Sequence, residues 1–274
     1  MSREDLAVSH DTSKEHVPAD EVNVGTKEDA NNMTGSVRTK KQVVTARIQL
    51  AALCWCLFLA GWNDGTLGPL LPRIQEAYHI GYTIVSLLFV FVCTGFVFGA
   101  LINVPLTDKY GFGKVFIDNG VQGREIQYFA TGSVCQLVAY TLQAPELPFP
   151  VFVMAATLNG VGLALQDAQA NGFVASIKDN AETKMGILHA VYGLGALAAP
   201  LISTQFAQIR RWSFHFLVSI GIAVSNTILL VAVFRFRRQD ECLAQTGQPP
   251  EEQNMGDKST FRQILTHKTV HLLA

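Results

Sequence analysis

The sequence is organised around residues 159–172, which read Asn-Gly-Val-Gly-Leu-Ala-Leu-Gln-Asp-Ala-Gln-Ala-Asn-Gly. This stretch lies inside an apolar run that is long enough to cross a bilayer, yet it contains several amides and one carboxylate, Asp167. A charged side chain at the bilayer centre costs roughly 2.5–3.5 kcal/mol on insertion scales, so it marks a functional site by default. A similar stretch, Gly61-Trp62-Asn63-Asp64-Gly65, lies in another apolar run. The two stretches together predict a transporter unit with two acids inside the membrane.

The composition is typical of a membrane protein. Hydrophobic residues make up 49% of the 274 residues and charged residues 16%, whereas soluble domains carry about 25% charged residues. The mean hydropathy is +0.24, although polar segments towards both ends lower it. A net charge of -1 gives no overall basic signature for nucleic acid. The cysteines form neither a C-x-x-C pair nor a paired framework, so neither disulfides nor a zinc site is indicated. We expect no metal and no cofactor, with protons as the coupling ion.

Six apolar runs predict an all-α membrane protein, because each is close to the ~20 residues that a spanning helix needs. Residues 1–41 contain no aromatic residue and many polar ones, so we expect a disordered cytoplasmic tail. A six-helix transmembrane bundle then fills 42–234, with spans at about 47–71, 82–104, 126–145, 149–175, 186–208 and 213–234. Asp167 follows Asp64 by 103 positions, and each acid follows an amide, which suggests a 3+3 inverted repeat.

Two segments at the edges of the bundle leave alternatives open. Residues 235–268 resemble a cytoplasmic linker with a short amphipathic helix, and 269–274 resemble the start of a seventh helix at which the sequence stops. We therefore expect either a half-length transporter or a truncated gene model. Residues 115–128 precede the third run and are polar for a helix start. They are compatible with a long loop or with a translated intron.

The distribution of Lys and Arg predicts the orientation in the membrane. The basic residues of one side are Arg38, Lys40, Lys41, Arg47, Lys109, Lys114, Arg124, Lys178, Lys184, Arg235, Arg237 and Arg238. Those of the other side are Arg73, Arg210 and Arg211. The richer side faces the cytoplasm by this rule, so we expect a multi-pass protein with both termini cytoplasmic. Its membrane would be the plasma membrane.

Asp64 and Asp167 are the candidates for proton coupling. Burial of a carboxyl group disfavours its charged form, so either acid can load and release a proton as access alternates. Their positions along the predicted helices place Asp64 in the outer half of the membrane and Asp167 in the inner half. We therefore expect no direct contact between the two carboxyl groups.

Polar side chains near the two acids are candidates for substrate binding. In lipid such groups must face protein or a water-filled cavity. The alternative is a hydrogen-bonded stripe between helices, which polar residues in membranes also form. The candidate residues are Asn63, Asn159, Gln166, Gln169, Asn171 and Tyr192.

A cytoplasmic turn between the second and third runs reads Asp108-Lys109-Tyr110-Gly111-Phe112-Gly113-Lys114. An acid-base pair followed by glycine can join neighbouring helix ends through charge-assisted hydrogen bonds. The turn resembles the signature loop of the major facilitator superfamily, although Val104 replaces a usual glycine and the later basic residue is delayed. We expect it to act as a gating loop through Asp108, Lys109, Gly111 and Lys114.

Two further segments, Asn63-Asp64 and 165–174, resemble the fucose-permease-like branch of that superfamily, in particular the fungal bypass-of-stop-codon-type sugar transporters. The resemblance covers about 45–238 except 115–128, which corresponds to the N-terminal half of a twelve-helix transporter. It implies proton-coupled import of a sugar or similar small polar solute, with Asp64 and Asp167 as the coupling acids. It also implies cavity roles for Asn63, Gln166 and Asn171, and it implies no enzyme activity.

The expected partners are the lipid bilayer, a small polar solute, and either a C-terminal half or a second copy of the chain. Two other interpretations remain. Alternating access requires two bundles that rock about a shared site, so the chain alone would be a transport-inactive membrane fragment. An intramembrane aspartyl protease is the remote alternative, because such enzymes need adjacent acids and these two lie at different predicted depths.

Overall fold

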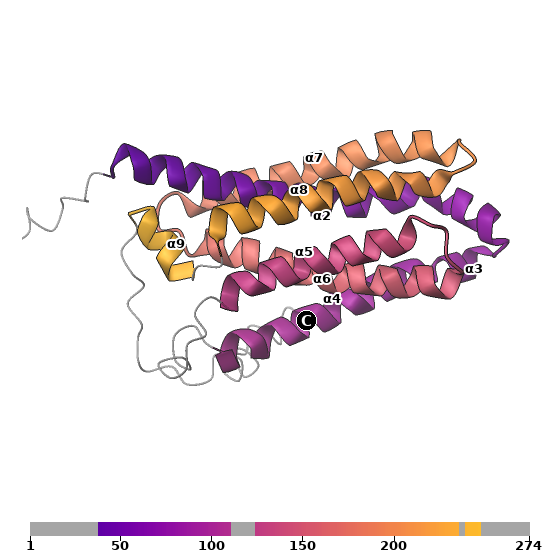
Figure 1. Ribbon diagram of the computed structural model, residues 1–274, viewed down its shortest axis with the longest axis horizontal. Helices are drawn as coiled ribbons and strands as arrows, with labels where there is room; N and C mark the ends of the chain where they lie inside the picture. The colour runs from indigo at the N-terminus through magenta and orange to yellow at the C-terminus, as the bar shows by residue number, and fades with distance from the viewer. Residues whose placement is uncertain (1–37, 111–123, 236–238, 248–274) are drawn as a thin grey trace, which may run out of the picture. The chain divides into compact units, whose positions relative to one another are not determined.

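The computed structural model describes residues 38–110, 124–235 and 239–247 of the chain (Figure 1). Most of the predicted tail, most of the segment at 115–128 and the predicted seventh helix lie outside the described residues. Every regular element in the described ranges is helical. The elements are α2 (Lys40–Tyr78), α3 (Tyr82–Val85), α4 (Leu87–Tyr110), α5 (Arg124–Gln143), α6 (Phe149–Ala175), α7 (Ala181–Ala207), a 3-10 helix η1 (Trp212–Phe214), α8 (His215–Phe234) and α9 (Gln239–Gln245).

Each of the six predicted runs contains one long helix, although the run at 82–104 begins with the short helix α3 and the run at 213–234 begins within η1. Five stretches in the described part are long and apolar enough to cross a membrane, namely 40–78, 82–103, 149–175, 181–207 and 212–234. The remaining run forms α5, a helix of 20 residues that packs against α6 and α8. The chain is therefore an all-α membrane protein, and α2, α4, α5, α6, α7 and α8 make up its bundle.

The first helix extends beyond the predicted span at both ends. It begins at Lys40 because Thr39 forms a capping box with Gln42, in which each side chain binds the backbone N–H of the other residue. It continues through Pro69 and Pro72. Proline is tolerated in spanning helices because neighbouring groups satisfy the backbone atoms that it leaves unpaired. The helix ends where His79 adopts a left-handed conformation, with φ of 53°.

The closest backbone approach on one side of the bundle is the crossing of α2 and α7. A Cβ atom added to Gly61 would collide with the carbonyl oxygen of Tyr192. A Cβ atom added to Gly195 would collide with the carbonyl oxygen of Phe58. Small residues allow helices in lipid to approach closely, and here each helix contributes one glycine to the contact.

The crossing of α4 and α6 is built in the same way. A Cβ atom added to Gly160 would collide with the carbonyl oxygen of Val92, and one added to Gly95 would collide with that of Thr157. Both helices of this pair also contribute one glycine each. Figure 1 shows α7 along the upper side of the bundle and α4 along its lower side.

These contacts fix the register of the internal repeat. Adding 99 to a contact position in α2 gives its counterpart in α6, so Gly61 corresponds to Gly160. Adding 100 to a contact position in α4 gives its counterpart in α7, so Gly95 corresponds to Gly195. The predicted offset of 103 between the two acids is therefore wrong by about one helical turn. Asp64 and Asp167 therefore do not occupy equivalent positions of the repeat. The prediction paired them because each follows an amide, whereas the packing of the helices pairs Asp64 with Leu163.

Candidate functional site in the four-helix cavity

A cavity of about 480 Å³ lies between α2, α4, α6 and α7, the four helices of the two crossings. Both predicted coupling acids contribute to its wall. The acids are the only Asp or Glu residues in a wall that also contains His189 and Tyr192 and is otherwise largely apolar. The lining residues are Leu57, Ala60, Asp64, Val92, Cys93, Phe96, Val97, Leu163, Asp167, His189 and Tyr192.

Asp64 is exposed and accepts a hydrogen bond at each carboxylate oxygen. The Tyr192 hydroxyl donates to Oδ2 over 2.6 Å, which links α7 to α2. The side-chain amide of the neighbouring Asn63 donates to Oδ1 over 3.3 Å. With one donor at each oxygen, the orientation of the Asp64 carboxyl group is fixed.

Asp167 is partly buried and takes its partner from its own helix. The amide nitrogen of Asn171, one turn later, lies 3.0 Å from Asp167 Oδ1 and 3.0 Å from the Asp167 carbonyl oxygen. His189 of α7 contributes to the wall of the same cavity. The two acids therefore share one cavity but bind different partners, and only Asp64 is bound by a residue of another helix.

Three residues predicted to contact substrate lie in the core beside the cavity. Asn63, Asn159 and Gln166 are only 6%, 3% and 2% exposed. The Asn63 carbonyl accepts hydrogen bonds from the amide of Asn159 and from the Tyr140 hydroxyl at 3.3 Å. Helix α6 contacts α2, α4, α5 and α7. Its buried amides therefore meet neighbouring helices, and only Leu163 and Asp167 of α6 line the cavity.

Gln166 joins α2, α6 and α8 and does not line the cavity. Its carbonyl accepts a hydrogen bond from the Cys56 thiol over 2.8 Å and one from the Asn226 amide over 3.1 Å. This arrangement matches the alternative of an interhelical polar stripe. Gln169 likewise donates to Asn103 of α4 over 3.1 Å. Of the predicted substrate contacts, Tyr192 is the residue that lines the cavity.

The predicted gating loop is only partly described. Asp108 and Lys109 lie in the last turn of α4, and their side chains are outside the described structure. Gly111 and Lys114 lie outside the described residues. The gating role of the four residues remains a prediction.

The sequence-based prediction missed two residues that bind the predicted polar side chains, Asn226 at Gln166 and Tyr140 at Asn63. Asn226 lies in the apolar run of α8 and is fully buried. The rule that singled out Asp64, a polar group inside a spanning run, would have found it. Tyr140 carries no comparable signal, because tyrosine is common in apolar helices and only the fold brings its hydroxyl to Asn63.

Comparison with known proteins identifies relatives of the chain. Residues 53–273 match the family model of the Major Facilitator Superfamily. Bypass of stop codon protein 6 of Saccharomyces cerevisiae is 26% identical over 195 residues, which are 71% of this chain and 37% of that protein. The Glucose/mannose transporter GlcP of Bacillus subtilis is 28% identical over 156 residues, 57% of this chain and 35% of that protein.

A third relative is an uncharacterized transporter of Schizosaccharomyces pombe. It is 24% identical over 224 residues, which are 80% of this chain and 42% of that protein. The chain thus matches well under half the length of these curated relatives. Because the family model covers most of the sequence and the helices form a membrane bundle, the chain is a multi-pass integral membrane protein that belongs to the Major Facilitator Superfamily.

Proposed function

We propose that the protein serves proton-coupled import of a sugar or a similar small polar solute by alternating access. The observation that carries the proposal is that Asp64 and Asp167 line one cavity from two different helices. Carboxylates and a tyrosine hydroxyl bind the hydroxyl groups of such a solute, and an acid in this setting can also carry the coupling proton. GlcP, one of the relatives, is named a glucose and mannose transporter.

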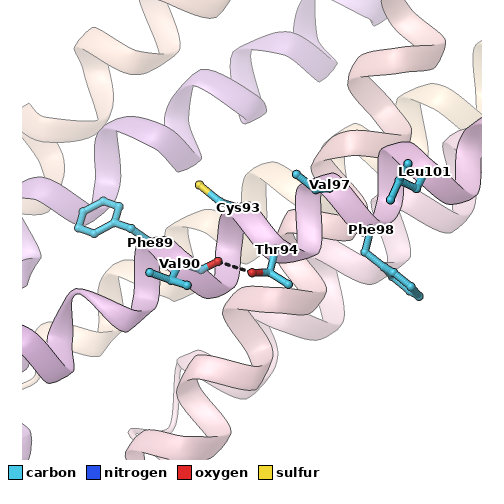
Figure 2. Close-up of a pocket in the computed structure, with 7 residues that line it drawn as sticks. All are labelled: Phe89, Val90, Cys93, Thr94, Val97, Phe98 and Leu101. Atoms are coloured by element: carbon cyan, nitrogen blue, oxygen red, sulfur yellow. Dashed lines mark hydrogen bonds between the residues drawn. The ribbon is translucent and has the colours of Figure 1, made fainter. Parts of the chain in front are cut away.

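Alternating access needs a second bundle, and we propose that one covers the apolar face of α4. Figure 2 shows this face, with the side chains of Phe89, Val97 and Phe98 standing on one helix. They border a hollow of about 640 Å³ that Val90, Cys93, Thr94 and Leu101 complete. Cys93 and Val97 also line the cavity with the two acids, so the same partner surface would close both.

The second bundle would be either a C-terminal half on the same polypeptide or a second copy of this chain. The exposed leucines of α7 (Leu194, Leu197 and Leu201) form a further apolar surface for it. In this proposal both termini face the cytoplasm, in line with the excess of Lys and Arg on that side. The protein would act in the plasma membrane.

Uptake measurements in proteoliposomes test the function. The purified chain is reconstituted, and entry of radiolabelled glucose and mannose is followed with and without an inward proton gradient. We expect saturable uptake that the gradient accelerates and that Asp64→Asn and Asp167→Asn each abolish. Glu76→Gln, which changes an exposed acid in a surface ion pair with Arg73, is the matched control and retains uptake. Uptake that stays gradient-dependent in both aspartate variants would disprove the coupling roles.

The same vesicles distinguish the two sources of the second bundle. If a second copy supplies it, the 274-residue chain alone supports uptake, and crosslinking yields a dimer. If a C-terminal half supplies it, uptake appears only when that half is present. A chain that inserts but transports no solute in either form would be the transport-inactive fragment.

A further inference from the structure

The carboxylate of Asp64 accepts hydrogen bonds from Asn63 of α2 and from Tyr192 of α7. Asn63 in turn accepts hydrogen bonds from Tyr140 of α5 and Asn159 of α6. We propose that Tyr140 and Asn159 are positioning residues, which act through Asn63 and together with Tyr192 hold this carboxylate as an oriented acceptor for a solute hydroxyl. The role in solute binding rests on the proposed function. The hydrogen-bonded network itself does not.

The first part of the network fixes the direction of the Asn63 side chain. Its carbonyl oxygen accepts from the Tyr140 hydroxyl of α5 and from the Asn159 amide of α6. A side-chain amide has one accepting end and one donating end. With two donors on its oxygen, Asn63 must turn its nitrogen the other way, and there it meets Asp64 Oδ1 at 3.3 Å. Tyr140 and Asn159 thus direct the Asn63 amide nitrogen towards Asp64.

The second part comes from α7. Tyr192 crosses to Asp64 Oδ2 over 2.6 Å, next to the point where its own backbone carbonyl lies against Gly61. No side chain separates the two helices there, so the distance between the Tyr192 backbone and α2 is fixed. Asp64 is therefore held at one oxygen from α7 and at the other from its own helix.

The internal repeat shows that helix packing does not require this network. In the equivalent crossing of α4 and α6, Leu163 takes the place of Asp64 and Val92 takes the place of Tyr192. Gly162 takes the place of Asn63 and packs against Gly132 of α5. Both crossings bring a glycine against a backbone carbonyl, yet the second has no polar side chain at the positions equivalent to Asn63, Asp64 and Tyr192. The polar network is thus an addition to the packing scaffold, at the cavity wall.

The arrangement selects a hydrogen-bond donor from the cavity. Each carboxylate oxygen offers about two acceptor positions, and one position on each is already used. Asp64 is exposed, so the remaining positions are open to the cavity side. A hydroxyl group that enters finds an acceptor whose orientation is already set, which reduces the entropy lost on binding.

Infrared difference spectroscopy of the reconstituted 274-residue chain tests the network. The carboxylate stretching band of Asp64 is assigned, at alkaline pH, as the band that disappears in Asp64→Asn. We expect Tyr192→Phe to shift this band strongly and Tyr140→Phe to shift it less, because the second change acts only through Asn63. Asn159→Leu gives a second, independent variant for the same relay should Tyr140→Phe fail to fold.

Tyr78→Phe is the matched control. It removes a tyrosine hydroxyl that donates to the Leu147 carbonyl over 2.7 Å and to no member of the network, so the Asp64 band keeps its position. A band that is unmoved in Tyr140→Phe and in Asn159→Leu would overturn the relay through Asn63. A band that moves equally in Tyr78→Phe would overturn it too, since the shift would then report a general loss of packing.

The outcome is independent of the transport assay. Shifted bands without any proton-coupled uptake leave the network intact and refute the proposed function. Proton-coupled uptake with unmoved bands does the reverse. If both hold, solute added to the vesicles shifts the Asp64 band in the wild-type chain, and the amount of solute needed rises in Tyr140→Phe.

Discussion

The crossing of α2 with α7 and the crossing of α4 with α6 have the same backbone arrangement and different chemistry. Both place one glycine of each helix against a backbone carbonyl of the other. The first has Asn63, Asp64 and Tyr192 beside its glycines, while the second has glycine, leucine and valine at the equivalent positions. Close helix approach and solute chemistry are therefore separate properties here. The glycines form both contacts, and a carboxylate with a tyrosine partner stands beside the first contact alone.

The largest effect is expected from forcing either crossing apart. Gly61→Leu and its counterpart Gly160→Leu each insert a side chain where the backbones touch, so we expect each to lose about 3 kcal/mol of unfolding free energy or more. Unfolding in lipid bicelles, followed by circular dichroism, measures the loss. Losses that differ severalfold between the two variants would contradict the equivalence of the crossings.

A second test builds the counterpart of the Asp64–Tyr192 pair into the crossing of α4 and α6. Leu163→Asp alone is expected to destabilise the bundle. Adding Val92→Tyr supplies the hydroxyl, and we expect a coupling energy of about 1.5 kcal/mol for the new charge-assisted hydrogen bond. A double-mutant cycle from the same unfolding measurement gives this energy. Purely additive effects of Leu163→Asp and Val92→Tyr would show that the two new side chains do not meet. The repeat offsets of 99 and 100 positions would then not describe side-chain contacts.

Removing the natural pair is expected to cost less. Tyr192→Phe deletes one hydroxyl beside an exposed acid that water can solvate, so we expect a loss of about 1 kcal/mol or less. The unfolding free energy of the variant decides this. A loss comparable to that of Gly61→Leu would mean that the polar network holds the helices together after all.

The smallest effect is expected at glycines that face open space. A Cβ atom at Gly68 or Gly193 would have no neighbour within 4 Å. Alanine is more favourable than glycine inside a helix by roughly 0.5–1 kcal/mol, so Gly68→Ala and Gly193→Ala are expected to leave stability unchanged or to raise it slightly. These variants serve as controls for the glycines at the crossings, and any marked loss would place unsuspected contacts at these positions.

The sequence predicted the helices well, because an apolar run of spanning length has few alternatives in a membrane. It also brought out both cavity acids, since a carboxylate in such a run stands out. It did not tell which face of α6 meets the cavity. Asn159, Gln166 and Asp167 look alike by pattern, and only the packing of α6 against its neighbours separates the buried amides from the acid at the cavity wall.

The repeat register was out of reach for a related reason. Matching Asp64 to Asp167 relied on the most conspicuous residues of two helices, whereas the fold matches residues that touch. The glycines at the crossings look ordinary in a sequence with 22 glycines. Their meaning depends on a contact partner about 60 to 140 positions away, which no local pattern specifies.

The repeat offsets of 99 and 100 positions also relate the two hairpins, α2 with α4 and α6 with α7, that connect one crossing to the other. From Gly61 to Gly95 the chain advances 34 positions, and from Gly160 to Gly195 it advances 35. The connecting segments differ in form, because one contains the short helix α3 and the other turns at Asn180 with φ of 50°. The two glycine-to-glycine spacings nevertheless agree within one residue. The two halves of the repeat thus keep the same spacing between their glycine contacts, although they turn the chain in different ways.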